Sequence, residues 1–445
     1  MQTVKKSVLI LFLAICLVSN AQEISPNLFG QNLWLASKAE GSRIGYIDEL
    51  WPKVKQSGAK IIRIGGNGYN KRMPNYETLT KWVKAIKNID AEPLMQVSQH
   101  KSPEESAKLV AFFNKDDKTR ITHWSIGNEP YHMAKMSVDS ISAFIKSHAS
   151  AMKAVDPSIK IHVPDLAAYY NEAYEPLLLD NKLSISGRDE NGNWYVDGIN
   201  FHNYPNAKDY TRYDVIFYSV TKMRGMILNL KKDIEAANKK YERTGDDALI
   251  WGLTEFNITY HNPDDLSVEG IAVPSFINGQ FWVDVFCMAM EYEAFTVTPW
   301  CIQESDRPRT YFGYVGAPPN FTPHSTYYHM QMLANHMKGR YIKMKSSNPY
   351  LKVFASKTEK ETTVVIMNQH ETNTFQIDLN KINTTESNDE NLHISSAKAI
   401  RGDYKGESKP NSTTLIKFNS KGEKILELLY NLDMAKQDMP PQQIK

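Results

Sequence analysis

The chain has 445 residues, of which 42% are hydrophobic and 23% are charged, so it holds enough apolar material for a large folded core. Of its 52 basic residues, Lys5 and Lys6 lie close to the N-terminus, and the other 50 balance the 50 acidic residues. A balanced charge argues against a nucleic-acid-binding protein, which would show a basic excess. Cysteine is too rare for a disulfide scaffold, and Cys287 and Cys301 leave room for one bridge at most.

Residues 1–21 have the pattern of a secretory signal peptide. Two lysines precede the apolar run Val8–Val18, which is too short for a good transmembrane helix, and a small residue, Ala21, ends the segment. We expect cleavage after Ala21 and a secreted or periplasmic protein without a membrane span. A surface lipoprotein anchored at Cys16 is a less favoured alternative, because Ile15 stands where a small residue is expected.

Eight short β-type runs then alternate with amphipathic stretches. The runs are Phe29–Leu35, Lys60–Ile64, Glu92–Val97, Ile121–Ile126, Lys160–Val163, Val196–His202, Ala248–Leu253 and Ala294–Trp300. Helices are predicted over Thr78–Ile89, Ser102–Asn114, Ser137–Val155, Tyr213–Lys240 and Thr326–Met337. This alternation predicts an α/β protein with a (β/α)₈ TIM barrel over residues 22–339. An open doubly wound sheet is the alternative, but no glycine-rich phosphate-binding loop follows the first strand.

The pattern changes after Gly339, where short alternating runs follow one another without a long helix. They are Tyr350–Ala355, Thr362–Met367, Thr374–Leu379, Leu392–Arg401, Ser412–Phe418 and Lys424–Leu429. Such runs, separated by turn residues, predict a C-terminal antiparallel β-sandwich domain over residues 340–432. The polar residues 433–445 are predicted to be a loose tail.

Two carboxylates stand at equivalent places on the fourth and seventh predicted strands. The fourth strand runs into Asn128 and Glu129, and the seventh runs into Glu255. Active sites of such barrels lie at the C-terminal ends of the strands, and strands four and seven face each other across the barrel mouth. Glycoside hydrolysis needs such a pair, because one carboxyl protonates the leaving oxygen while the other attacks the sugar or activates water.

The stretches IGNEP, at residues 126–130, and LTEFN, at residues 253–257, resemble those of glycoside hydrolase clan A, the retaining (β/α)₈ glycosidases. The resemblance implies that Glu129 is the acid/base and Glu255 the nucleophile. Clan members often also have a C-terminal β-sandwich, an arginine on strand two, a histidine or aromatic residue on strand six and a tryptophan on strand eight. The matching residues are Arg63, His202 with Tyr204, and Trp300.

Further substrate-binding candidates follow from the residue types. Arg63 lies in an apolar run and needs a partner, so it either pairs with Glu255 or braces the barrel. Tyr204 is a better candidate than His202 for touching the nucleophile, because its hydroxyl can donate to a carboxylate. Trp300 is either a stacking platform for a sugar or a core residue. The other candidates are Asn67, Asn128, Gln303, Arg307 and Arg309, with Glu304 less strongly supported.

The substrate is expected to be a polysaccharide or oligosaccharide, with no metal or other cofactor, since no metal-binding motif appears. Arg307 and Arg309 would suit a sulfated or uronic glycan such as a carrageenan or an agar-type galactan, unless they are surface charges paired with Asp306. A long loop over Ala168–Tyr195 would wall a cleft and favour endo-acting hydrolysis. The alternatives are an exo-acting glycosidase on a neutral glycan and a catalytically inactive carbohydrate-binding barrel.

Overall fold

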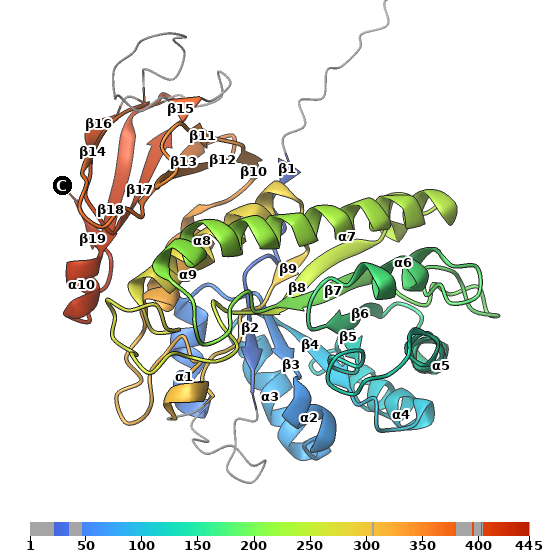
Figure 1. The fold of residues 1–445 in the computed structure, drawn as a ribbon. Helices are drawn as coiled ribbons and strands as arrows, with labels where there is room; N and C mark the ends of the chain where they lie inside the picture. The colour runs from blue at the N-terminus through green and yellow to red at the C-terminus, as the bar shows by residue number, and fades with distance from the viewer. Residues whose placement is uncertain are drawn as a thin grey trace, which may run out of the picture.

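The computed structural model describes residues 22–34, 47–304, 307–379, 394–395, 402 and 404–444. Eight parallel strands form one sheet in chain order (Figure 1). They are β2 (Gly30–Leu33), β3 (Ile61–Ile64), β4 (Glu92–Val97), β5 (His123–Ile126), β6 (Lys160–Leu166), β7 (Gly198–Asn203), β8 (Ile250–Phe256) and β9 (Thr296–Val297). A parallel bridge from Phe29 to Val297 brings the last strand back to the first, so the predicted barrel is confirmed.

Helices surround this sheet. They are α1 (Ile47–Gln56), α2 (Asn67–Lys71), α3 (Tyr76–Asn88), α4 (Pro103–Asn114), α5 (Val138–Val155), α6 (Asn171–Leu179), α7 (Val220–Lys240), α8 (Phe276–Glu291) and α9 (Ser325–His336). The start of α4 shows why local sequence predicts a boundary well: Ser102 caps the helix by accepting from Glu105 N, and the Glu105 side chain accepts from Ser102 N.

The prediction of one long loop over Ala168–Tyr195 is wrong in its first half, because α6 occupies it. The helix is short and carries Pro176 in its interior, which hides the helical pattern in the sequence. It forms because Ala173, Tyr174 and Leu177 bury completely against the barrel. The wall of a cleft on this side would therefore include a packed helix.

The C-terminal domain is built around an antiparallel seven-stranded sheet, with two small two-stranded sheets beside it. The large sheet has the order β1 (Gln22–Glu23), β10 (Arg340–Ile342), β12 (Leu351–Lys357), β13 (Glu361–Asn368), β17 (Ser412–Asn419), β18 (Lys424–Asn431) and β19 (Gln442–Gln443). The small sheets pair β11 (Lys345–Ser346) with β15 (Ile394–Ser395), and β14 (Phe375–Asp378) with β16 (Lys405–Ser408). This agrees with the predicted antiparallel domain, to which β1 adds a strand from the start of the barrel segment.

The polar tail is not loose. Helix α10 (Leu432–Lys436) follows β18 directly, and β19 pairs with β18 through Leu428 and Leu429. An edge strand needs backbone partners more than apolar side chains, so composition did not reveal it. The predicted signal peptide, residues 1–21, and all but residues 394–395 of the predicted run Leu392–Arg401 lie outside the described residues.

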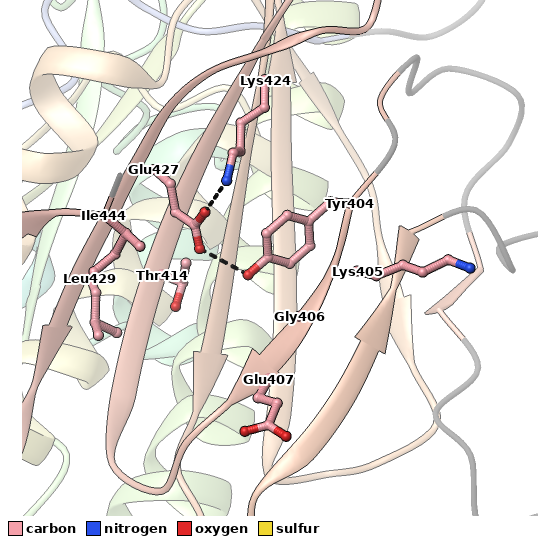
Figure 2. A pocket seen from close by; sticks show the side chains of 9 residues that line it. All are labelled: Tyr404, Lys405, Gly406, Glu407, Thr414, Lys424, Glu427, Leu429 and Ile444. Atoms are coloured by element: carbon pink, nitrogen blue, oxygen red, sulfur yellow. Dashed lines mark hydrogen bonds and ion pairs between the residues drawn. The ribbon is translucent and has the colours of Figure 1, made fainter.

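A surface pocket of about 400 Å³ lies on the β-sandwich domain (Figure 2). Its charged groups already have partners, because Lys424 pairs with Glu427 at 2.6 Å and the Tyr404 hydroxyl donates to Glu427 at 3.0 Å. Lys405 pairs with Asp378, and Glu407 accepts from Gln376, so each charged group that lines the pocket has a protein partner.

Helix α8 lies between the barrel and the β-sandwich domain, and all 16 of its residues are buried. The outward side chain of Gln280 donates to the backbone oxygens of Asn368 and Ser412, each at 3.1 Å. Figure 1 shows the orange and red strands beside α8 and α9. Cys287, also on α8, and Cys301 are both buried and unpaired, so the structure contains no bridge between them. Among the described helices, none is long and apolar enough to span a bilayer.

One buried ion pair joins the two domains: Lys352 Nζ on β12 lies 2.7 Å from Asp284 Oδ2 on α8. We expect Lys352→Ala to lower the free energy of unfolding by about 3 kcal/mol, because it leaves the buried Asp284 carboxylate without its cation. Urea unfolding followed by circular dichroism measures this. Lys81→Ala, which breaks an exposed pair with Asp48, is the control and should change the midpoint little. Equal midpoints for both variants would contradict the role of the buried pair.

Candidate active site

Glu129 stands just beyond the end of β5 in an unusual backbone conformation. Its φ is 47°, in the left-handed region that non-glycine residues rarely adopt. Two contacts hold the turn: Glu129 N donates to Asp165 O at 2.9 Å, and Asn128 N donates to Gln99 Oε1 at 3.1 Å. Left-handed residues of this kind gather at functional sites, where surrounding contacts over-determine them. The turn aims the carboxyl of Glu129 into the barrel mouth, where it is 8% exposed.

Glu255, on β8, has one partner for each of its carboxylate oxygens. Arg63 Nη1 donates to Oε1 at 2.8 Å, and the Tyr204 hydroxyl donates to Oε2 at 2.9 Å. Both donors were expected from the sequence, and the contact from Arg63 is a charge-assisted hydrogen bond. Glu255 is 6% exposed, so a small part of it faces the mouth of the barrel.

Arg63 is the centre of the buried polar network. It is fully buried on β3, and its guanidinium also donates to Asn32 Oδ1 at 3.0 Å and to Asn128 Oδ1 at 2.7 Å. A second carboxylate, that of Asp165, lies 3.4 Å from Nη2. Burial opposes the charge of Asp165, but the charge of Arg63 and the nearby His202 imidazole outweigh it and lower its pKa to about 2. One arginine therefore contacts two carboxylates in the barrel interior.

His202, on β7, lies between Glu129, Glu255 and Asp165. Its Nδ1 is 3.0 Å from Glu129 Oε1 and 3.7 Å from Glu255 Oε2, and its Nε2 is 3.7 Å from Asp165 Oδ1. Burial alone would lower the pKa of this imidazole, but the charge of Glu255, the nearby Asp165 and the hydrogen bond to Glu129 raise it to about 9. Burial likewise opposes the charge of Glu129, and the hydrogen bond from His202 nevertheless lowers the pKa of Glu129. At neutral pH the shared proton therefore resides on His202.

Trp300 lies beyond β9 and borders the site on the side of Glu255. Gly66 makes room for its ring: φ at Gly66 is 99°, and a Cβ there would lie 2.6 Å from Trp300 Cη2. Trp34 packs edge-on against it, with ring centroids 5.1 Å apart. The indole Nε1 donates to Glu304 Oε2 at 2.8 Å. This hydrogen bond fixes the orientation of the indole ring and of the Glu304 carboxyl.

The structure brings most of the predicted residues together. Asn67 Nδ2 donates to Glu129 Oε2 at 3.3 Å, and Asn128 keeps its buried Nδ2 without a protein partner, ready to donate to a ligand. Gln303 also has a buried Nε2 without a partner. Arg307, which precedes the short 3₁₀ turn η4 (Pro308–Thr310), and Arg309, in the middle of that turn, are both exposed and lie outside the buried network.

Two predicted substrate-binding residues are enclosed by the protein. Arg63 and His202 are each 0% exposed, so they reach a ligand only through the carboxylates they hold. Sequence reasoning missed Asn32 and Asp165 as members of the site. The signal was present in the strand-end position of Asp165, but nothing in the sequence showed that its side chain meets Arg63.

One oxygen of Glu129, one of Glu255 and one ring nitrogen of His202 lie within 4.8 Å of one another, which is the spacing of a metal-ligand set. A metal would need His202 in its neutral form. The pKa of His202 is raised to about 9, and both carboxylates already accept hydrogen bonds from the protein. The three groups are therefore better suited to sharing a proton than to binding a metal ion.

No family model matches the sequence, and no curated protein is similar to it in sequence. Solved structures do match. An α-L-arabinofuranosidase from Thermotoga maritima, in complex with arabinose, is 15% identical with a TM-score of 0.63, covering 89% of this chain and 97% of its own. A monomeric β-xylosidase from Caulobacter crescentus is 13% identical with a TM-score of 0.59, covering 89% and 97%. A family 44 xyloglucanase from Paenibacillus polymyxa is 12% identical with a TM-score of 0.57, covering 89% and 96%.

The fold is that of the clan A glycosidases. The match spans the barrel and the β-sandwich domain together, since it covers about nine tenths of this chain. The resemblance drawn from IGNEP and LTEFN is therefore confirmed as a likeness of fold. Within this barrel, Glu129 follows the fourth strand and Glu255 lies at the end of the seventh strand.

The proton on His202 should make stability depend on pH. Its folded-state pKa of about 9 lies above the ordinary value of about 6.5, so its contribution is complete below pH 6.5 and is lost as the pH rises through 9. We expect the free energy of unfolding to fall by about 3 kcal/mol over that range in the wild type, and His202→Gln to lack this fall. Urea unfolding at a series of pH values measures it.

His148→Gln is the matched control for this measurement. Burial lowers the pKa of His148, so this residue is neutral in both states above pH 6.5 and adds no slope there. The control should therefore retain the wild-type fall. The same slope in His202→Gln as in the wild type would place the titrating proton on another group.

Proposed function

We propose that the protein is a retaining glycoside hydrolase in which Glu255 is the nucleophile and Glu129 the acid/base. The observation that carries the proposal is the carboxylate pair itself. Oxygens of Glu129 and Glu255 lie within 4.8 Å of each other, and the two carboxylates have different hydrogen-bond partners. A short separation suits double displacement, since inverting enzymes need room for a water between carboxyls that are about 6.5–9.5 Å apart. Arg63 and Tyr204 each donate to one oxygen of Glu255 and so fix the orientation of its carboxylate for attack.

The first step couples attack to protonation. Of the influences that raise the pKa of His202, the charge of Glu255 is the largest. As Glu255 bonds to the anomeric carbon, that charge is consumed and the pKa of His202 falls. The proton then moves from Nδ1 across 3.0 Å to Glu129 and on to the glycosidic oxygen, which leaves with its sugar.

The second step reverses the path of the proton. Water replaces the leaving group, Glu129 accepts its proton, and the oxygen attacks the anomeric carbon while the ester bond to Glu255 breaks. The restored charge of Glu255 then draws the proton back to His202. Two inversions leave the anomeric configuration unchanged.

The substrate is proposed to be a glycan, cleaved in endo fashion by a protein that is secreted or periplasmic after loss of residues 1–21. The structural neighbours named above act on arabinosides, xylosides and xyloglucan, and they support an exo mode as the second candidate. A pair of partly exposed aromatic rings supports the endo mode: Tyr131 and Tyr170 lie on the Glu129 side with ring centroids 5.5 Å apart. A sugar on the leaving-group side could stack there.

Glu255→Ala should lower turnover by about 10⁴-fold or more on every substrate, because no group replaces the nucleophile. Glu129→Ala should impair polysaccharide cleavage strongly but spare glycosides with dinitrophenolate leaving groups, which need little protonation. Added azide should accelerate Glu129→Ala and give a glycosyl azide of retained configuration. Reducing-end assays and product NMR measure these outcomes.

Glu235→Ala, which removes an exposed carboxylate on α7, is the control for loss of a glutamate and should retain full activity. Loss of the same size on all substrates in Glu129→Ala would contradict its acid/base role. Binding of a glycan by wild type and Glu255→Ala alike, without release of reducing ends by either, would favour the inactive binding barrel.

Arg307 and Arg309 are proposed to bind anionic groups of the glycan at positions beyond the cleaved sugar. The double variant Arg307→Ala/Arg309→Ala should lower kcat/KM about tenfold or more on a sulfated galactan and leave a neutral β-glucan or xylan unaffected. Release of reducing ends from carrageenan, agarose, xylan and β-glucan measures this. An equal effect on neutral and sulfated substrates would make the two arginines structural.

A further inference from the structure

Glu304 is a third carboxylic acid at the candidate active site, and the proposed reaction does not use it. It follows β9, four residues beyond Trp300, whose indole N–H donates to its Oε2. Burial raises its pKa to about 7, and the negative charge of Glu255 adds to that effect. Among the described residues, no lysine or arginine forms an ion pair with it. Burying a carboxyl without a nearby cation costs free energy. A bound ligand that donates a hydrogen bond to Glu304 would offset that cost.

Glu304 lies on the nucleophile side of the carboxylate pair. Trp300, whose indole holds Glu304, donates its backbone N–H to Phe256 O at 2.9 Å, beside Glu255 in the chain. Tyr131, in contrast, follows Glu129 by two residues and packs against Tyr170. The two sides of the pair therefore carry different surfaces: Trp300 with Glu304 on one, Tyr131 with Tyr170 on the other.

Trp300 and Glu304 together have the chemistry of a sugar subsite. An indole face takes the apolar C–H face of a pyranose or furanose ring, and a carboxylate accepts from the hydroxyls at the ring edge. The indole is fixed by Gly66 and Trp34, and it in turn fixes one oxygen of Glu304. The other oxygen, Oε1, makes no hydrogen bond to a described residue and is available to a ligand.

The charge of the subsite limits what can bind. Two cations, Arg63 and His202, are already engaged by Asp165, Glu129 and Glu255. Glu304 adds negative charge when it is ionised. Among the described residues no further lysine or arginine pairs with these acids, so a carboxylate or sulfate on the bound sugar would meet net repulsion there.

We propose that Glu304 accepts a hydrogen bond from a hydroxyl of the sugar that becomes bonded to Glu255, and that it selects a neutral sugar there over a uronic or sulfated one. This inference rests on the proposed hydrolase function and narrows it, because it places any anionic group of the glycan outside the cleaved sugar.

The new reducing end of each product is the sugar that was bonded to Glu255, so product analysis reads this subsite directly. Purified full-length protein is incubated with carrageenan, agarose, xylan, β-glucan and glucuronan, and the reducing ends are identified by mass spectrometry after reduction. The expected products carry a neutral sugar at the reducing end, even where the polymer carries sulfate elsewhere. Sulfated or uronic reducing ends from the wild type would overturn the inference while leaving the hydrolase function intact.

Two variants separate the hydrogen bond from the charge. Glu304→Gln removes the charge and should lower kcat/KM on the preferred polymer about 10- to 100-fold while admitting products with anionic reducing ends. Glu304→Asp keeps the charge but withdraws the oxygen, so it should lose a similar factor and still exclude anionic sugars. Unchanged kcat/KM and unchanged products in both variants would overturn the inference.

Folding and function are controlled separately. Each variant's urea midpoint is compared with that of the wild type, and Glu304→Asp serves if Glu304→Gln is unstable. Trp300→Phe keeps a ring but removes the N–H that holds Glu304, and it should raise KM more than it lowers kcat. If the wild type releases no reducing ends from any polymer, the proposed hydrolase function fails and this inference fails with it.

Discussion

The buried guanidinium of Arg63 is the interaction on which the site depends. Its contacts reach Asn32, Asn128, Asp165 and Glu255, which come from strands or strand ends on different parts of the barrel. Without a cation at this point, two buried carboxylates would face each other in an apolar interior, and each would be driven to protonate. The arginine thus joins the geometry of the barrel mouth to the ionisation of the groups that line it.

The charged groups of this site form a series of contacts, each group influencing the next. Arg63 contacts Asp165 and Glu255 and lowers the pKa of Asp165, these two acids raise the pKa of His202, and His202 in turn donates to Glu129. A change at Glu255 is therefore felt at Glu129 through His202, although each contact is local. Glu304 does not belong to this series of contacts, because its only donor among the described residues is the indole N–H of Trp300.

The β-sandwich domain influences the barrel through α8. This helix is buried on all sides, with the barrel on one face and strands β12, β13 and β17 contributing partners on the other. Gln280 and Asp284 are polar residues in an apolar helix, and their partners are supplied by the β-sandwich domain. The two domains consequently form one structure around a shared helix, in keeping with neighbours that match over both.

Much of this arrangement could be predicted from local patterns. The eight strand runs matched the barrel strands because strands buried on both faces need continuous apolar runs. Glu129, Glu255, Arg63 and Tyr204 could be proposed because each stands at a strand end or in an apolar run where a polar side chain needs a reason. Helix α6 and strand β19 were missed, since Pro176 and a polar composition obscured elements that form by packing and edge pairing.

The sequence by itself determined the alternation of strands and helices, and with it the edge of the barrel at which the polar residues gather. Only the tertiary structure decided which of them meet. Asp165 and His202 gained their importance from partners 102 and 73 residues away, and their pKa values depend on distances that no sequence spacing specifies. The reason is physical: periodicity records which face of an element is buried, whereas electrostatic coupling depends on separations of a few ångströms between elements brought together by the closed sheet.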